Sequence, residues 1–355
     1  MHVPKVMRAV ICPTTGPISV LQIQQTAVPV PQSGQVLIKI LGFGINRAGQ
    51  IELQFRPELQ ESNEFLEMFT RQGHSPGVQF PRTIGIECIG TVAAHHASAP
   101  GTAGLPIGTH VATCMGGLGR EIPGSYAEYV CVPAENVRPF PQTSLPVATL
   151  ASLPEMFQTT WGALVKGLDF KRGESLLVRG ATSSIGICAI QIARYLGASR
   201  IGGTTRSGAR TSMLKDHGAD EVYVDSGSIE ADVSASSAGK FDKILELIGT
   251  TTLRDSARCA LEMGTVCMAG IQGGEWELTQ FSPFEFLPNR VRLSVYGGGP
   301  DDFRACPWEE LIQAIEDGKI KVPVKVFSLD EIQKVHEILE SGGGGAKLVV
   351  VISED

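Results

Sequence analysis

The chain has 355 residues, of which 43% are hydrophobic and 19% are charged, and its formal net charge is -7. This composition is typical of a folded globular protein, and the length indicates about two domains. The negative net charge argues against nucleic acid as a partner, because phosphate backbones are bound by clustered Lys and Arg. No apolar run approaches the ~18 residues of a membrane-spanning helix, and residues 1–35 lack the features of a secretory signal, so we expect a cytoplasmic protein with no membrane partner.

The first part of the chain predicts short strands separated by Gly and Pro turns. They are expected at residues 6–11, 20–28, 35–46, 80–92, 108–111 and 124–132. Many short strands of this kind indicate a compact, partly barrel-like β domain. We place this domain at residues 1–139.

From residue 140 onward, helices alternate with strands. Helices are expected at 148–167, 185–196, 209–217 and 253–263, and strands at 175–178, 200–204, 222–224, 243–248, 265–269 and 291–296. This alternation implies right-handed crossovers and a doubly wound parallel sheet of the Rossmann type, which we place at 140–300. Residues 301–355 would then return to the β-rich domain through helices at 308–317 and 329–339, a segment at 324–328 and a strand at 347–352. The predicted fold class is therefore α/β.

The stretch 174–210 is the most informative, because it reads as strand, tight turn, helix, strand and basic loop. A dinucleotide-binding turn has the form G-x-G-x-x-G and opens a helix after a strand. Here its three positions hold Ala181, Ser183 and Gly186, so only the last is a glycine. Small residues still allow a close approach of the backbone to a pyrophosphate at the helix N-terminus. An ordinary strand-to-helix turn is the alternative.

The strand that follows this helix ends in a basic loop. A carboxylate would be expected there for the ribose of NAD(H), but Arg206 and Arg210 occupy this region. A guanidinium forms paired hydrogen bonds with phosphate, so the replacement favours the 2′-phosphate of NADP(H). The alternative is that both arginines are solvated residues at the start of a helix.

The eight cysteines are scattered singly, mostly among apolar neighbours, and none forms a CxxC pair. This distribution indicates buried, reduced thiols rather than a disulfide framework or a zinc site built from clustered cysteines.

Six short motifs follow one another in an order that resembles the medium-chain dehydrogenase/reductase superfamily, and within it the zinc-free quinone oxidoreductases. They are GIN at 44–46, GIECIG at 85–90, GSYAEY at 124–129, TTWGAL at 159–164, GATSSIG at 180–186 and ELIG at 246–249. The resemblance covers nearly the whole chain. It implies a GroES-like β domain, a Rossmann domain and a C-terminal return to the first domain.

The superfamily's alcohol dehydrogenases bind a catalytic zinc through a Cys after the first long strand, a His in a Gly-His-Glu motif and a further Cys or His. Here Asn46 stands near the first place, and Ile86 takes the His position beside Glu87. Isoleucine cannot ligate a metal, so we expect no catalytic zinc. The region that would hold a structural zinc contains Cys114 alone, so that zinc is not expected either. Two histidines stand at positions 95 and 96 and could bind a stray ion, but this segment is typical of a solvated loop.

The resemblance implies hydride transfer from NADPH to a small electrophile that is already activated by conjugation, such as a quinone or an α,β-unsaturated carbonyl compound. Asn46 and Thr160 would lie near the nicotinamide. The pyrophosphate would contact Ala181, Thr182, Ser183, Ser184 and Ile185. The 2′-phosphate would contact Arg206, Ser207 and Arg210. The edge of the cofactor groove would be formed by Ile248, Gly249, Ala269 and Gly270.

The proton donor is less clearly marked. Related enoyl reductases use a Tyr in a Gly-x-Tyr segment, where this chain has RQGHSP at 71–76. His74 is the nearest substitute, because its side chain titrates in a useful range. A loop histidine without a catalytic role is the alternative, and Asn46 is the other candidate catalytic residue.

Residues 49–66 depart from the family pattern, in which the Asn-containing loop runs almost directly into a segment like MFTRQG. They form either a surface insertion, which loops tolerate at small entropic cost, or the product of a retained short intron. Sequencing of spliced transcripts separates the two.

Two other functions stay open at this point. One is an NADPH-binding protein with little catalysis, and the other is an enoyl reductase that acts on acyl chains. The resemblance also implies a homodimer or homotetramer, for which the strand at 291–296 is a candidate edge.

Overall fold

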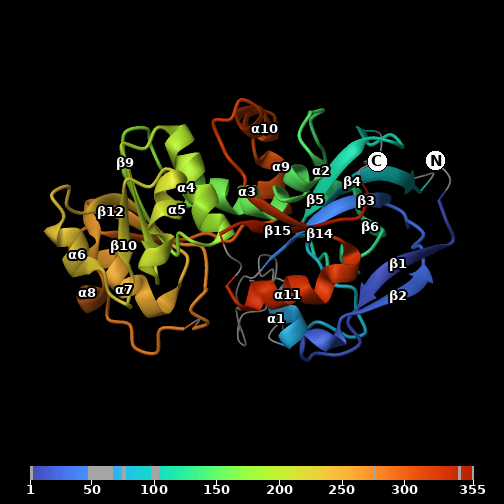
Figure 1. Ribbon diagram of the computed structural model, residues 1–355, viewed down its shortest axis with the longest axis horizontal. Helices are drawn as coiled ribbons and strands as arrows, with labels where there is room; N and C mark the ends of the chain where they lie inside the picture. The colour runs from blue at the N-terminus through green and yellow to red at the C-terminus, as the bar shows by residue number, and fades with distance from the viewer. Residues whose placement is uncertain are drawn as a thin grey trace.

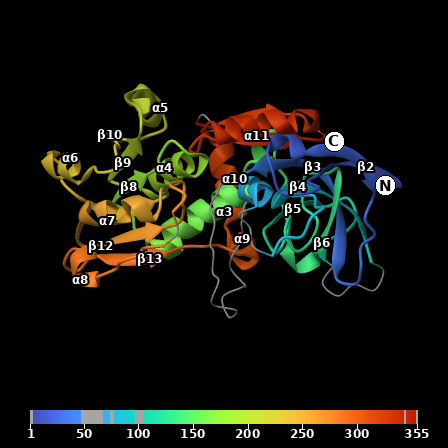
Figure 2. The same ribbon diagram turned by 90° about the horizontal axis from the view of Figure 1, so that it is seen from below.

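The computed structural model of the protein describes residues 3–46, 67–73, 77–96, 104–275, 277–342 and 345–353. Two bodies lie side by side, with helix α3 (Pro154–Gly162) between them, as Figure 1 and Figure 2 show from two directions. One body is β-rich and the other is built on a parallel sheet. The α/β fold class predicted from the sequence is confirmed. Among the described residues, none of the helices has the length and apolar character needed to cross a bilayer.

The β-rich body contains a seven-stranded sheet with the order β14-β15-β3-β4-β5-β7, in which β6 also pairs with β3. Its strands are β3 (Gln35–Ile45), β4 (Glu87–His95), β5 (His110–Cys114), β6 (Tyr129–Pro133), β7 (Val137–Pro139), β14 (Val324–Phe327) and β15 (Lys347–Val351). A separate antiparallel pair is formed by β1 (Val6–Ile11) and β2 (Gln22–Ala27). Because β15 pairs with β3, the C-terminal segment joins the same sheet as the N-terminal strands.

The second body contains a six-stranded sheet in which every neighbouring pair is parallel. The strand order is β10 (Glu221–Val224), β9 (Arg200–Thr205), β8 (Ser175–Arg179), β11 (Phe241–Glu246), β12 (Ala260–Met268) and β13 (Arg292–Val295). The strand predicted at 291–296 is thus β13, and it lies at one edge of the sheet. The order reverses direction between β8 and β11, which is where ligands bind in open α/β sheets.

Helices cover both faces of the parallel sheet. Leu176 on β8 belongs to the same buried cluster as Ile190 on α4 (Ser184–Leu196), whereas the next residue, Leu177, belongs to a cluster that includes Leu253 on α7 (Thr250–Arg258). Successive side chains of a strand point to opposite faces, so α4 and α7 lie on opposite sides of the sheet. The remaining helices of this body are α5 (Thr211–Asp216), α6 (Glu230–Ala235) and α8 (Pro283–Phe286).

The junction between the two bodies is packed with buried apolar side chains. Leu41 of β3, Phe157 of α3, Trp308 of α10 (Trp308–Glu316) and Val178 of β8 belong to one continuous cluster. The other helices near this junction or on the β-rich body are α1 (Glu67–Gln72), α2 (Val147–Ala151), α9 (Pro300–Ala305) and α11 (Ile332–Glu340). The two bodies are thus joined through α3 by continuous apolar packing.

Two helices differ from the sequence expectation. The single helix predicted at 148–167 is α2 followed by α3, because Pro154 occupies the first turn of a new helix, and it ends in one π turn at Ala163–Gly167. The helix predicted at 253–263 begins at Thr250 and ends at Arg258, and β12 starts two residues later. The sequence ALEMG at the start of this strand favours a helix, but Ala260 pairs with Phe241 of β11. The next four residues lie at an irregularity in the register, and regular pairing resumes at Thr265 and Lys243.

Candidate active site

The turn between β8 and α4 is held by Ser183. Its hydroxyl accepts a hydrogen bond from the Gly186 N–H (3.0 Å) and donates one to the Gly180 carbonyl oxygen (2.8 Å). Ser183 therefore caps α4, the role in which serine is strongly preferred. The first-turn N–H groups of Ser184 and Ile185 have no intrahelical partner, and both residues line the cavity. A glycine-poor turn thus still presents donors to an anion.

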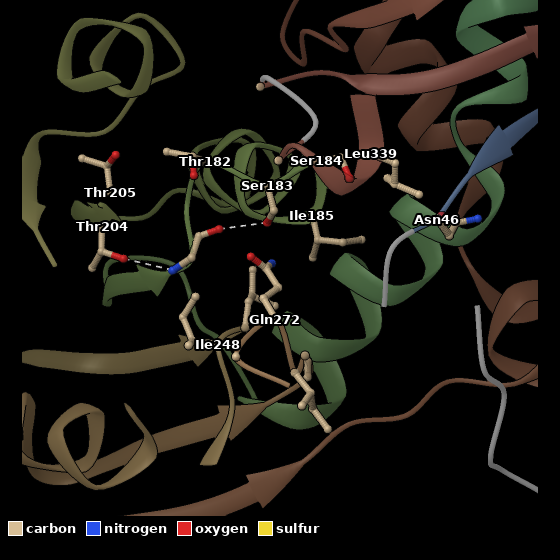
Figure 3. Close-up of a pocket in the computed structure, with 18 of the residues that line it drawn as sticks. Asn46, Thr182, Ser183, Ser184, Ile185, Thr204, Thr205, Ile248, Gln272 and Leu339 are labelled. Carbon is tan, nitrogen blue, oxygen red and sulfur yellow. Dashed lines mark hydrogen bonds between the residues drawn. The ribbon is translucent and has the colours of Figure 1, made fainter. Parts of the chain in front are cut away.

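Two glycines are required by close packing at this turn. A Cβ atom on Gly186 would lie 2.6 Å from the Gly180 carbonyl oxygen and from Ala181 Cα. Gly180 has φ +86°, a conformation that side chains rarely adopt, and its N–H donates to Thr204 Oγ1 (3.0 Å; Figure 3). The turn, β9 and α4 are consequently held in close contact.

A cavity of about 540 Å³ opens between the turn and the β-rich body. Figure 3 shows Thr204 and Thr205 toward one end, Asn46 and Leu339 toward the other, and Ile185 between them. The lining comes from the carboxyl ends of the parallel strands, from β3 and β15, and from the loop after β12. The residues are Ile45, Asn46, Met68, Glu155, Thr159, Gly180, Thr182, Ser183, Ser184, Ile185, Thr204, Thr205, Arg206, Arg210, Asp225, Leu247, Ile248, Ala269, Gly270, Ile271, Gln272, Gly273, Leu339, Gly342, Gly345, Ala346 and Leu348.

Most of the predicted site residues meet in this cavity, but four do not line it. Thr160 is fully buried, and its neighbour Thr159 takes the place in the lining. Ala181 is buried beneath the turn, Ser207 caps the short turn at 208–210, and Gly249 lies behind Ile248. Successive positions on a helix differ in direction by about 100°, so Thr159 and Thr160 of α3 cannot both face the cavity. His74 and the 49–66 segment lie outside the described residues.

One end of the cavity is basic. Arg206 is exposed and Arg210 is half-buried, and the described part of the chain supplies no ion-pair partner to either guanidinium. Asp225 also lines this end, but its two oxygens accept hydrogen bonds from Arg179 (2.8 and 2.9 Å). Asp225 is thereby engaged by Arg179, a cation that it shares with Asp255, and among the described residues it forms no ion pair with Arg206 or Arg210. The two cavity arginines are therefore available to an anionic ligand.

Arg179 lies at the centre of a buried network beneath the carboxyl ends of the strands. It is fully buried and also donates to Asp255 (2.5 Å) on α7. Glu246, at the end of β11, accepts hydrogen bonds from the N–H groups of Ile248 (2.6 Å) and Gly249 (3.0 Å). Burial raises the pKa of Glu246, and its hydrogen bonds oppose this shift. The network fixes the loops that form the floor of the cavity.

The opposite end of the cavity adjoins a buried cluster of polar side chains, which we call the lysine cluster: Asn46, Glu87, Glu155 and Lys347. The Lys347 ammonium lies 3.0 Å from Glu87 Oε1 and 3.2 Å from Glu155 Oε2, and it also donates to Asn46 Oδ1. Asn46 Nδ2 donates to Glu87 Oε1 (2.8 Å), and the Glu155 N–H donates to Glu87 Oε2 (2.6 Å). Lys347 and Glu87 are 1% and 0% exposed, so these charges are paired away from water.

The lysine cluster stands where the superfamily's catalytic zinc would be held, and its residues do not fit a metal. Ile86 is buried and apolar, and the amide oxygen of Asn46 accepts from Lys347. The described residues contain no group of three His, Cys, Asp or Glu side chains that could hold a metal ion. The Lys347 ammonium already provides the positive charge among the acceptor oxygens of Asn46, Glu87 and Glu155, and it would repel a metal cation.

Glu155 and Lys347 were not identified from the sequence, although each carries a signal. Glu155 follows a proline within the apolar segment 150–157, and Lys347 begins the otherwise apolar strand KLVVV. A charged residue at a position that the pattern assigns to the core is rarely buried unless it is paired. Single-sequence reasoning shows such residues but not their partners, since Glu155 and Lys347 lie 192 positions apart.

Comparisons with known proteins agree with this architecture. Residues 32–142 match the family described as "Alcohol dehydrogenase GroES-like domain", and residues 184–315 match "Zinc-binding dehydrogenase". The quinone oxidoreductase of Rattus norvegicus is 26% identical over 358 residues, which cover 98% of each chain. A highly reducing polyketide synthase of Aspergillus niger, azaB, is 25% identical over 284 residues, which cover 76% of this chain and 11% of the synthase.

A solved structure has the same fold. The mycobacterial protein Rv1454c, complexed with NADPH, superimposes with a TM-score of 0.76 at 24% identity and covers 97% of this chain and 99% of its own. The two family matches follow one another along the chain, as the β-rich body and the parallel sheet do in the fold. This chain therefore belongs to the medium-chain dehydrogenase/reductase superfamily of oxidoreductases and is quinone oxidoreductase-like.

Proposed function

We propose that this protein is an NADPH-dependent oxidoreductase that transfers a hydride, without zinc, to a quinone or an α,β-unsaturated carbonyl compound. The observation that carries the proposal is the cavity itself. At one end lie two arginines that have no ion-pair partner in the part of the chain that the structure describes; helix N–H donors lie in the middle, and the lysine cluster lies at the other end. These features follow one another as the 2′-phosphate, pyrophosphate and nicotinamide do along NADPH.

The residues present fit the dinucleotide. Gly180 and Gly186 keep the turn free of side chains, and Ser184 and Ile185 supply N–H donors for the pyrophosphate. Arg206 and Arg210 would hold the 2′-phosphate. When bound, NADPH supplies the hydride. The chain's own residues contribute position, because apolar side chains such as Ile45, Met68 and Leu348 exclude water from the end next to the lysine cluster.

The chemistry of the described residues supports this substrate class. An alcohol or simple ketone needs a Lewis acid to polarise its oxygen, whereas Ile86 is apolar and the amide oxygen of Asn46 accepts a hydrogen bond from Lys347. A quinone or conjugated carbonyl compound accepts hydride without a metal, because the resulting negative charge is delocalised.

The test is consumption of NADPH, followed by the absorbance of the reduced nicotinamide, with a panel of ortho- and para-quinones and enones. We expect turnover that prefers NADPH to NADH and persists after dialysis against a chelator. NADPH binding without consumption by any electrophile would identify a binding protein with little catalysis. Alcohol oxidation that requires added zinc would contradict the proposal.

An enoyl reductase acting on acyl chains is the second candidate, and the similarity to the Aspergillus niger polyketide synthase favours it. The two are separated by comparing a short enoyl pantetheine thioester with a simple enone. A kcat/KM for the thioester more than about tenfold above that of any quinone or enone would assign the second function.

The cytoplasmic location and the homodimer or homotetramer remain predictions. So do the domain boundaries at residues 139 and 300. Size-exclusion chromatography with light scattering would determine the oligomeric state.

A further inference from the structure

Reduction of a conjugated electrophile by hydride leaves an anion that needs a proton. The inference about the source of this proton rests on the proposed function. Glu155 belongs both to the lysine cluster and to the cavity lining. It is held at the start of α3, where its Oε1 accepts a hydrogen bond from the Thr159 hydroxyl (3.2 Å), which also lines the cavity. Glu155 is therefore the carboxyl group that joins the buried cluster to the substrate space.

The other members of the lysine cluster are poorly placed to supply a proton. The three N–H bonds of the Lys347 ammonium are directed to Asn46, Glu87 and Glu155. Asn46 lines the cavity, but its amide nitrogen donates to Glu87 and its amide oxygen accepts from Lys347. An amide is also not an acid in this range. Of the predicted catalytic residues that the structure describes, Asn46 is thus engaged in positioning.

The charges of the cluster favour a neutral Glu155. Glu87 accepts hydrogen bonds from Asn46 Nδ2, the Glu155 N–H and Lys347, and its carboxylate form balances the Lys347 ammonium. A second ionised carboxylate would leave one uncompensated negative charge in a site from which water is almost excluded. Such a charge is costly, and a buried group avoids the cost by binding a proton.

We propose that Glu155 is the catalytic acid and that its proton completes the reduction. The hydride forms a C–H bond at the electrophilic carbon, and the π electrons move to the carbonyl oxygen or the α-carbon. The O–H bond of Glu155 then breaks, and its proton joins that atom. NADPH is oxidised to NADP⁺ and the substrate is reduced. The Glu155 carboxylate, facing Lys347 and the Thr159 hydroxyl, regains a proton from solvent after the product and NADP⁺ have left the cavity.

The surroundings of Glu155 support this assignment. Burial raises the pKa of Glu155, the charge of Glu87 on β4 raises it further, and Lys347 on β15 opposes both. From α4, the ionisable neighbour is the Cys188 thiol, whose pKa burial raises to about 12, so it stays neutral. A raised pKa favours the protonated form of an acid before the reaction, and a neighbouring cation stabilises the carboxylate that forms afterwards.

The test uses the full-length protein and the substitution Glu155→Gln, which preserves size and removes the acidic proton. We expect kcat with a quinone or enone to fall by about 10²–10⁴-fold, while the Kd for NADPH changes by less than about twofold. The parent should lose activity at alkaline pH as the acid ionises, and E155Q should lack this alkaline limb. Glu310→Gln is the matched control, since Glu310 is exposed on α10 and far from the lining, and it should match the parent.

A second variant covers the case in which E155Q does not fold. Glu155→Asp keeps the acid but shortens its reach, so we expect a partial kcat with the alkaline limb retained. If E155Q keeps kcat within about threefold of the parent, or if it keeps the alkaline limb, Glu155 is not the acid. That failure differs from failure of the proposed function, in which the parent itself would consume no NADPH with any quinone, enone or thioester.

Discussion

The two arginines at the basic end of the cavity give the sharpest test of cofactor choice. Arg206 and Arg210 line the cavity beside Thr205, at the carboxyl end of β9. We predict that the double substitution Arg206→Ala and Arg210→Ala weakens binding of NADPH selectively. Because NADH lacks the 2′-phosphate, it has no group at the position that these guanidiniums would reach.

The size of the effect follows from exposure. A hydrogen bond to a charged group contributes about 1.5–3 kcal/mol, and solvent screening places the exposed Arg206 at the low end of that range. The half-buried Arg210 should contribute about 2 kcal/mol. Together, about 3.5 kcal/mol corresponds to an increase of roughly 300-fold in the Kd for NADPH. The Kd for NADH should change by less than about threefold.

The assay is titration of nicotinamide fluorescence with each cofactor at low and high salt, since screening reduces the contribution of exposed charges. Arg194→Ala is the matched control. Arg194 is also a partly exposed arginine of this body, but it pairs with Asp220 near the C-terminal end of α4. Equal losses of affinity for NADPH and NADH, or an NADPH affinity within twofold of the parent, would refute the assignment of the 2′-phosphate to these arginines.

Three further predictions concern the stability of the scaffold. Burial lowers the pKa of His336 to about 3, so the folded protein does not bind a proton that the unfolded chain binds below pH ~6.5. The contribution of His336 to the free energy of unfolding should therefore be fully present above pH ~6.5 and should fall by about 1.4 kcal/mol per pH unit below it. Urea unfolding of His336→Gln as a function of pH should lack this part of the pH dependence. Gly186→Ala should lower the free energy of unfolding by about 1–3 kcal/mol and weaken NADPH binding, whereas Gly208→Ala, where nothing lies within 4 Å, should change neither measurement appreciably. In the same urea assay, Arg179→Met should lower the free energy of unfolding by about 3–5 kcal/mol, because its two aspartate partners would lose their buried cation. A decrease below about 1 kcal/mol would show that the network is not needed for folding.

The local sequence was sufficient for the elements with strong periodicity. The apolar run around Leu177 and the helical spacing after Ile185 predicted β8 and α4, and both are present. Composition and alternation also gave the class of fold. The strand predicted at 265–269 is the regularly paired part of β12, but the helix predicted at 253–263 was extended too far, because α7 ends at Arg258 and Ala260 already pairs with Phe241 of β11. Strand pairing depends on residues that a local window does not contain.

The candidate site divides in the same way. The turn residues and Arg206 lie within one continuous stretch, so their sequence shows both their chemistry and their proximity. The lysine cluster draws on β3, β4, α3 and β15, and only the tertiary structure brings Glu155 to Lys347. The sequence by itself determined which side chains carry charge and which segments form strands and helices. The tertiary structure decided which charges are buried together, because Coulomb energies and proton affinities depend on distance and on exclusion from water, and neither quantity is local in the chain.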